Sequence, residues 1–453
     1  MNADRPRTPN GRLPLRTLLS YGSSMIGLNG MLTMVGVHLL FFCTEVAHIG
    51  PRVVSLVMAL AQVWDAITDP LMGYLSDRTP WKWGRRRPYI LLASLPTAAL
   101  FFCVFSPPTR LSAGGMSLFF AASLLLFYAC RTVWDTPYSS LAPELTLDYD
   151  ERTRVSGYQQ VFGTLGDVLG TLAPVLLVGM FATPRTGWSV VVALVALVAL
   201  GSALSTYVGT RENPRLGKAS QLSLIESFRA TFRNRPYRFL VLTSTLTGMS
   251  NYATIAVVRY VIKYWFRAPE MEKYFFGAFF VGVFLSIPLW VGITRRVGKK
   301  AAYIGTMLVY SVILWGIMGI GRGDHLLFGV LMVLAGAFNI GLWLIPGSIV
   351  PDIIEWDQLQ VGERREGAYY GIWTLIRKAA IGGAYILIGL VLDGIGFEPG
   401  AAEQPAPVLL GMRALLGPVP SVLLLIGLVI FLKFPITKRV HQDMLRQLAE
   451  REG

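Results

Sequence analysis

Charge is scarce in this sequence. Of its 453 residues, 15% are Asp, Glu, Lys or Arg and 53% are hydrophobic, with a mean hydropathy of +0.52. A soluble protein of this length needs more polar side chains to cover its surface. The composition therefore argues against a soluble globular fold and indicates a membrane protein.

Cysteine and the usual signatures of catalysis are also scarce. The three cysteines, Cys43, Cys103 and Cys130, all lie in apolar stretches, so the sequence predicts neither a disulfide framework nor a metal site. We find no GxxxxGK[ST] phosphate loop, no HExxH and no Ser-His-Asp arrangement. These absences argue against an ATP-driven pump and predict a protein that is not an enzyme and has no cofactor. The basic N-terminus lacks the pattern of a removable signal peptide.

Long apolar runs, by contrast, are plentiful. About 20 such residues cross a bilayer, and in lipid they do so as a helix because the backbone must satisfy its own hydrogen bonds. The sequence predicts an all-α membrane protein with twelve transmembrane helices. They are placed at 17–46, 52–76, 88–107, 113–142, 154–183, 188–210, 237–266, 272–296, 301–321, 324–350, 366–395 and 407–434.

A basic connection after the sixth span divides the chain into two similar halves. Glycines and bases recur after spans two and eight, and such repeats are typical of transporters whose halves rock about a central site. The matching residues are Gly73, Asp77, Arg78, Gly84 and Arg85 in one half and Gly292, Arg296, Gly298, Lys299 and Lys300 in the other. The predicted parts are an N-tail at 1–16, six helices at 17–210, a central loop at 211–236, six helices at 237–434 and a C-tail at 435–453.

Basic residues are distributed unevenly among the loops. The net charge of +14 is compatible with nucleic-acid binding, but the Lys and Arg residues gather in both tails and in the loops after even-numbered spans. That asymmetry is the positive-inside pattern. It predicts a multi-pass protein of the inner or plasma membrane, with both termini cytoplasmic and without nucleic acid as a partner.

Several acids lie inside the apolar segments. Asp65 and Asp69 are four residues apart, so they share one helix face. Carboxylates at membrane depth cost about 2.5–3.5 kcal/mol on insertion scales and usually mark ion or proton pathways. Span four adds Arg131, Thr132 and Asp135. These oxygens suit Na⁺ or an exchangeable proton, although Arg131 and Asp135 also fit a pair that only makes insertion tolerable.

Other charged residues in the spans leave alternatives open. Asp167 in span five is either an isolated acid facing water, an acid paired with a base, or part of the pathway. Lys378 in span eleven, next to Arg377, could neutralise the acids when the cation leaves. The basic run after span two is either a phosphate site or, more commonly, a topology anchor that pairs with acids at neighbouring helix ends.

Three motifs carry a resemblance to a known family. They are WDAITDPLMGYLSDRTPWKWGRRRPYIL, WDTPYSSLAPELTLD and PDIIEWDQLQVGERREGAYYGIWTLIRK. Together they resemble the major facilitator superfamily and, more narrowly, the glycoside–pentoside–hexuronide:cation symporters of the melibiose permease group. The similarity extends over essentially the whole chain and implies two pseudo-symmetric six-helix halves.

The resemblance assigns roles to individual positions. The implied cation-binding residues are Asp65, Asp69, Thr68, Thr132 and Asp135, and the implied coupling residue is Lys378. We add Arg131 as a second coupling residue because of its position on span four near Asp135. The implied substrate-binding positions are Asn29, Asp135, Ser139, Gln160, Trp343 and Thr374. Trp373 is added as an aromatic residue that could stack on a sugar ring, although such residues are more often packing or interface residues. The implied topology or gating loop contains Asp77, Arg78, Arg85 and Arg86.

Some of these positions depart from the melibiose permease. Asn29, Gln160 and Ser139 stand where that protein has an aspartate, an arginine and a tryptophan that bind sugar. Thr68 replaces a cation-site asparagine. The departures leave the cation site largely intact and place the identity of the solute in question.

The sequence therefore predicts a secondary active transporter that couples Na⁺ or H⁺ to symport of a small polar solute by alternating access. A sugar or glycoside is the leading solute, and an amphiphile such as a lysolipid is the alternative. A non-transporting receptor or scaffold is a third reading. We expect a monomer whose partners are its solute and membrane lipid.

Overall fold

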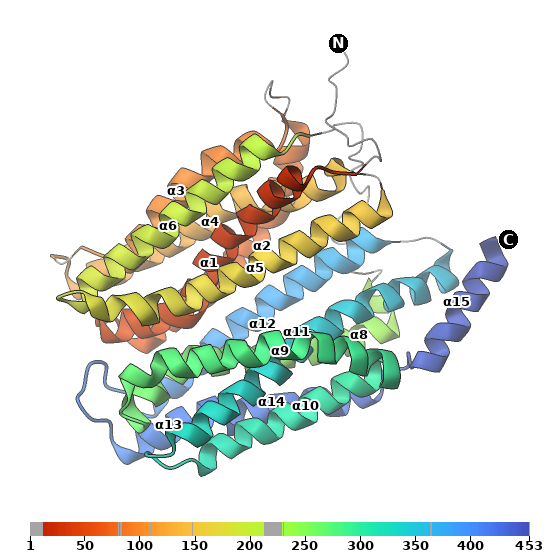
Figure 1. The fold of residues 1–453 in the computed structure, drawn as a ribbon. Helices are drawn as coiled ribbons and strands as arrows, with labels where there is room; N and C mark the ends of the chain where they lie inside the picture. Colours follow the sequence, from red (N-terminus) through yellow and green to blue (C-terminus); the bar gives the residue numbers. More distant parts are fainter. Residues whose placement is uncertain are drawn as a thin grey trace. The chain divides into compact units, whose positions relative to one another are not determined.

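The chain is almost entirely helical and forms two compact units, Met1–Ala219 and Ser220–Gly453 (Figure 1). The computed structural model describes residues 12–452 apart from 80, 82, 83, 109, 147, 213–228, 230, 363 and 364. Most of the predicted N-tail and central loop therefore lies outside the described residues. No strand occurs in the part of the chain that is described, which confirms the all-α prediction.

Unit 1 contains six long helices. They are α1 (Leu15–Glu45), α2 (Pro51–Arg78), α3 (Arg87–Phe105), α4 (Ala113–Leu145), α5 (Tyr149–Leu177), continued by the short η1 (Val178–Met180), and α6 (Pro184–Gly209). Local sequence explains several starts, because Ser112, Asp148 and Thr183 each accept a hydrogen bond from a backbone N–H in the first turn of the helix that follows.

Unit 2 repeats this arrangement with more interruptions. Its long helices are α8 (Arg235–Tyr260), extended by the π-turn η3 (Val261–Trp265), α9 (Glu272–Val297), α10 (Lys299–Gly316), α11 (His325–Val361) and α12 (Glu366–Gly394). Two 3₁₀ turns, η4 (Pro269–Met271) and η5 (Ile317–Gly319), join neighbours. The last predicted span is built from α13 (Ala406–Leu416) and α14 (Pro418–Leu432), and α15 (Lys438–Glu452) follows.

Eleven segments of the described chain are long and apolar enough to cross a membrane. The one predicted span that is not among these eleven is the seventh, at 237–266, which corresponds to α8, a helix of 26 residues but a less apolar one. Its polar side chains Thr243, Thr247, Ser250 and Asn251 are buried, and α8 packs against α12 and α14. The bundle, and not lipid, surrounds these groups, so α8 has no need of a uniformly apolar surface.

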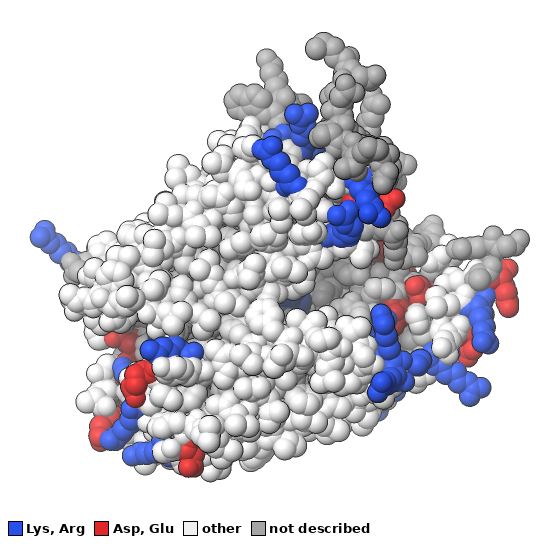
Figure 2. Space-filling view, in the orientation of Figure 1, with Lys and Arg blue, Asp and Glu red and all other residues white. Residues whose placement is uncertain are grey.

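Charged side chains gather towards the ends of the helices, and the flanks between them are almost free of charge (Figure 2). Leucine and valine dominate the exposed hydrophobic residues. An apolar flank bordered by charged ends is the surface that a bilayer requires. The chain is therefore a multi-pass membrane protein.

Glycine permits close approach of helices in both units. In unit 1, a Cβ on Gly166 of α5 would lie 2.8 Å from the carbonyl oxygen of Ile26 in α1. In unit 2, a Cβ on Gly282 of α9 would collide with the carbonyl of Val333 in α11. Small residues at such contacts let backbones pack directly, which is how membrane helices gain van der Waals contact.

Three segments differ in detail from their predicted form. The tenth span, predicted at 324–350, continues as α11 to Val361 and ends at Gly362, whose φ of 81° is a common way to stop a helix. The span predicted at 407–434 breaks at Gly417, because Pro418 cannot continue the hydrogen-bond ladder of α13. The predicted C-tail contains α15, which packs against α11.

Candidate cation and solute sites

The predicted cation residues of unit 1 lie on the facing sides of α2 and α4. Asp65 is 2% exposed, and its Oδ1 accepts a 2.8 Å hydrogen bond from the hydroxyl of Thr132. The hydroxyls of Thr68 and Thr132 are 3.2 Å apart. These three side chains place several oxygen atoms close together at the α2–α4 contact, and hard cations prefer oxygen ligands.

Arg131 links two acids from different helices. One guanidinium nitrogen lies 2.7 Å from Oδ2 of Asp135 in the same helix, and the other lies 3.6 Å from Oδ2 of Asp65 in α2. Arg131 itself is 7% exposed. It is therefore more than an intrahelical partner, since one positive charge compensates two carboxylates across the contact.

Asp69 completes the acidic face of α2. Thr136 of α4 lies 3.5 Å from Oδ1 of Asp69, a long hydrogen bond. Sequence reasoning did not name Thr136, although its position one turn beyond Thr132 places both hydroxyls on the same face of α4. The four-residue spacing of Thr132 and Thr136 could have identified Thr136 from the sequence.

The predicted solute residues of unit 1 lie on three helices. The amide of Asn29 in α1 donates a 3.3 Å hydrogen bond to the carbonyl of Gly163 in α5. Gln160 in α5 and Ser139 in α4 are exposed. Asp135, also predicted to bind the solute, is half-buried, and its carboxylate forms an ion pair with Arg131.

Asp167 in α5 is half-buried and makes a different kind of contact. Its Oδ1 accepts a 2.7 Å hydrogen bond from Thr33 of α1, and no base pairs with it in the described part of the chain. Gln160, Thr164 and Asp167 recur at helical spacing, so they form a polar stripe on α5. A polar stripe in a membrane helix must face protein or water, and at Asp167 the contact in the structure is with α1.

Three large aromatic side chains near these helices in unit 1 differ in burial. Trp134 is fully buried, and its indole N–H donates a 3.1 Å hydrogen bond to Ser24. Tyr138 stacks on Tyr21 with ring centroids 4.7 Å apart. These rings pack the unit, whereas Trp64 is 44% exposed.

In unit 2, two of the three predicted solute residues line one recess. Trp343 of α11 and Trp373 of α12 both border it, together with Arg377. Thr374 does not, since it is exposed and its hydroxyl donates to the carbonyl of Tyr370 at 3.1 Å. Thr374 shares its side of α12 with Lys378, four residues further on.

The basic run after α2 binds acids of its own unit. Arg85 and Arg86 both pair with Glu144 at the end of α4, and Arg86 does so at 3.3 Å. The backbone N–H groups of Arg85, Arg86 and Arg87 donate to the carboxylate of Glu212 at 2.5–2.8 Å. Carboxylates thus already contact this run, which is the arrangement expected of an anchor between helix ends.

The remaining members of the predicted gating loop are placed only in part. The guanidinium of Arg78 lies over the ring of Tyr74, 3.9 Å from its centroid. The side chain of Asp77 lies outside the described residues.

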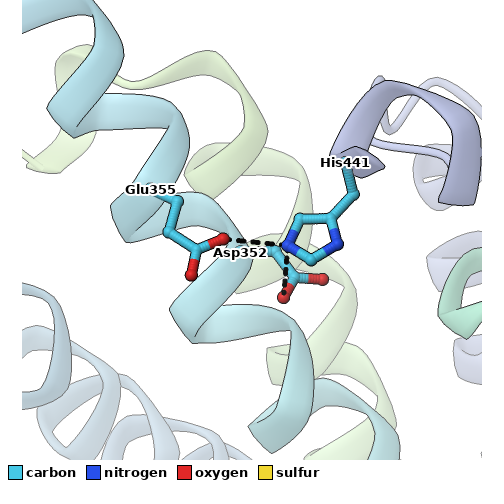
Figure 3. A group of neighbouring side chains, drawn as sticks. All are labelled: Asp352, Glu355 and His441. Atoms are coloured by element: carbon cyan, nitrogen blue, oxygen red, sulfur yellow. Dashed lines mark hydrogen bonds and ion pairs between the residues drawn. The ribbon is translucent and has the colours of Figure 1, made fainter. Parts of the chain in front are cut away.

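Unit 2 has a related cluster where α11 meets α15 (Figure 3). Nε2 of His441 lies 2.8 Å from Oε2 of Glu355 and 3.5 Å from Oδ1 of Asp352. The ammonium of Lys299 lies 2.6 Å from the same Oδ1 of Asp352. Asp352, Glu355 and His441 each offer one atom that could bind a metal ion, and these three atoms lie within 4.8 Å of one another. Because Lys299 already supplies a positive charge, we describe this cluster as an ion-pair network that attaches α15.

Comparisons with known proteins agree with this architecture. The family model described as MFS/sugar transport protein matches residues 20–438. An uncharacterized symporter of Synechocystis is 26% identical, with 97% of this chain and 98% of the relative covered. A sodium-dependent lysophosphatidylcholine symporter of Danio rerio is 26% identical over 92% of this chain and 85% of its own.

Two further matches complete the comparison. A putative sulfoquinovose importer of Escherichia coli is 26% identical, covering 92% of this chain and 89% of the relative. Among solved structures, a variant of the nucleoside transporter NupG superposes with a TM-score of 0.69 at 13% identity, over 92% of this chain and 99% of that one. At that identity the likeness shows the fold alone.

Proposed function

The chain belongs to the MFS/sugar transport protein family, and on that premise we propose that it couples Na⁺ or H⁺ to the symport of a small polar solute. As a member of this family it is a secondary transporter with the major facilitator fold, and not an enzyme. The coupling ion, the solute and the residues that bind them are the parts that we propose.

The observation that carries the proposal is the cluster of oxygens between α2 and α4. Asp65, Asp69 and Asp135 contribute three carboxylates, and Arg131 is the base that contacts two of them. Thr132 adds a hydroxyl within hydrogen-bond distance of Asp65. These charges leave up to two negative charges at the contact, and a monovalent cation would offset one of them, which supports a cation site composed of Asp65, Asp69, Thr68, Thr132 and Asp135.

Arg131 and Lys378 are proposed as coupling residues. Arg131 already touches two of the acids, so an arriving cation would compete with it for their oxygens. For Lys378 the support is its position in the family motif. If cation and solute are linked, each must tighten binding of the other by the same factor, and Lys378→Ala should bring that factor towards one. Calorimetric titration of each ligand with and without the other measures it.

The direct test of the proposed function is gradient-driven uptake. Purified protein in liposomes, loaded with K⁺ and diluted into Na⁺ or into acidic buffer, should accumulate a labelled sugar or glycoside only in the direction of the ion gradient. Asp69→Asn should fold and bind lipid as before but lose accumulation. If the solute reached the same concentration inside and outside the liposomes, with or without a Na⁺ or proton gradient, symport would be contradicted.

We also propose that both termini face the cytoplasm, because the bases after α2 and α9 follow the positive-inside pattern. Arg78 and Arg296 are exposed near the ends of these helices. Cysteines at these two positions should react with an impermeant maleimide only after the cells are opened. Labelling in intact cells would reverse the orientation.

An amphiphile is the second candidate solute. The observation that favours it is the lysophosphatidylcholine symporter among the relatives, while the sulfoquinovose importer favours a sugar. Competition for uptake by lysophosphatidylcholine, with no competition by glycosides, would select the amphiphile. The opposite result would select the sugar.

A further inference from the structure

One face of α12 borders a recess inside unit 2. Trp373 and Arg377 are one turn apart and Ala380 follows three residues later, so the three share this face. The recess is narrow, with room for about one water molecule in its enclosed part, and it opens on one side. The other lining residues come from α8, α10 and α11 and are Ser244, Thr247, Gly248, Tyr252, Tyr303, Leu342, Trp343 and Pro346.

Arg377 differs from three other bases of unit 2. Arg259 pairs with Glu272, Lys299 pairs with Asp352, and Arg413 donates to the carbonyl of Met318. Arg377 instead has no hydrogen bond or ion pair within the described residues, and the guanidinium is exposed to the recess. An arginine in a membrane helix is costly unless an opposite charge or a polar partner compensates it.

The ring of Trp343 orients this guanidinium. The central carbon of Arg377 lies 5.1 Å from the ring centroid, within the range of a cation–π contact. Trp343 is in turn packed edge-on against Tyr252, with centroids 6.0 Å apart. A cation–π contact uses no hydrogen bond, so the N–H groups of Arg377 remain available as donors, and those groups form a planar fork that matches an oxyanion.

Hydroxyl groups and a narrow helix contact border the same recess. The hydroxyls of Thr247 and Tyr303 are 3.2 Å apart. A Cβ on Gly248 would lie 3.3 Å from the Cβ of Ala380, so α8 and α12 approach each other closely here. The recess thus combines an unpaired cation, aromatic rings and hydroxyls within one unit.

We propose that this recess binds an anionic group of the transported solute, namely a sulfonate, phosphate or carboxylate. Two N–H groups of Arg377 hold two of its oxygens, because a guanidinium and an oxyanion form bidentate bonds. The rings of Trp343 and Trp373 contact the apolar faces of the solute next to that group. The inference rests on the proposed function and adds the charge of the solute to it.

The test uses matched solutes that differ in one charged group. Purified full-length protein in Na⁺ buffer is titrated with methyl glucoside, glucuronate and glucose carrying a 6-sulfonate, and separately with a monoacylglycerol and its lysophosphatidyl counterpart. We expect the wild type to prefer the anionic member of at least one pair by about tenfold or more, as for hydrogen bonds to charged groups.

Three variants identify the residue responsible. Arg377→Gln should reduce the preference to about threefold or less, and Arg377→Lys should retain part of it because the charge remains without the fork. The matched control is Arg322→Gln, since Arg322 also lies over an indole ring, that of Trp265 at 5.1 Å, but does not line the recess. The control should keep the wild-type preference.

The outcomes separate the inference from the proposed function. A preference that persists in Arg377→Gln overturns the inference, as does equal binding of charged and neutral members or no binding of any. Gradient-driven accumulation of a neutral glycoside would at the same time keep the proposed function. Arg377-dependent binding of an anionic solute without gradient-driven accumulation would keep the inference and overturn symport.

Discussion

The two units resemble each other at their helix ends and differ in their interiors. In unit 1, bases after α2 pair with Glu144, which follows Pro143 near the end of α4. In unit 2, Lys299 after α9 pairs with Asp352, which follows a proline in α11. The turns between α2 and α3 and between α9 and α10 each contain a glycine with a positive φ, 112° at Gly84 and 84° at Gly298. Glycine adopts such values without strain.

The interiors carry opposite charge. Unit 1 holds Asp65, Asp69, Asp135 and Asp167 in its membrane helices, against which Arg131 is the base that contacts two acids. Unit 2 presents Arg377 and aromatic rings to its recess. The repeat thus preserves the elements that hold helix ends together, while the residues that can meet an ion or a solute have diverged. The two units therefore offer a ligand groups of opposite charge.

The largest expected effect is that of Asp65→Asn. The amide cannot compensate a cation, so cation-dependent accumulation should fall by about 100-fold or more, as expected when a charged ligand is lost from a buried site. Expression should persist, because removing a membrane carboxylate eases insertion. Uptake assays in liposomes measure the loss. If Asp65→Asn kept the wild-type accumulation ratio, Asp65 would have a structural role and not a cation-binding one.

Glu144→Gln and Asp352→Asn compare the two helix-end pairs directly. Glu144 is 1% exposed and contacts two arginines, so its loss should cost about 3–5 kcal/mol of stability, as for one partner of a buried pair. The partner of Asp352 is Lys299, with 35% of its side chain exposed, so Asp352→Asn should cost only about 1 kcal/mol. Thermal unfolding measures both, and equal shifts would contradict the comparison.

Arg131→Gln asks whether the arginine competes with the cation. Without the guanidinium, Asp65 and Asp135 lose their shared positive partner. Na⁺ should then bind roughly tenfold more tightly, about 1.4 kcal/mol, and should raise the melting temperature more than in the wild type. Calorimetry gives the affinity, and a weaker Na⁺ affinity would show that Arg131 positions the acids instead.

The smallest expected effect on the cation is that of Asp167→Asn. Asp167 contacts Thr33 and not the α2–α4 cluster, so the Na⁺ affinity should stay within about twofold of the wild type, as for independent sites. Titration of this variant also provides the control for Asp65→Asn. A loss of Na⁺ binding as large as that of Asp65→Asn would place Asp167 within the cation site.

Several structural features followed from the sequence because they are local. Apolar runs of sufficient length require helices in lipid, and the spacing of Asp65 and Asp69, or of Arg131 and Asp135, fixes which residues share a helix face. Such conclusions need only the pitch of one helix and the solvent around it. For the basic run after α2 the sequence left a phosphate site and an anchor as alternatives, because its acidic partner Glu144 is 59 residues away along the chain.

Other features required the packed structure. The contact of Arg131 with Asp65 joins residues far apart in the chain, and it depends on how α2 and α4 are rotated against each other. The burial of the polar residues in α8 and the placement of Arg377 beside Trp343 depend likewise on neighbouring helices. A helical repeat determines which residues lie on one face, but packing alone determines what that face meets, because the interhelical contacts that set rotation are made between segments distant in sequence.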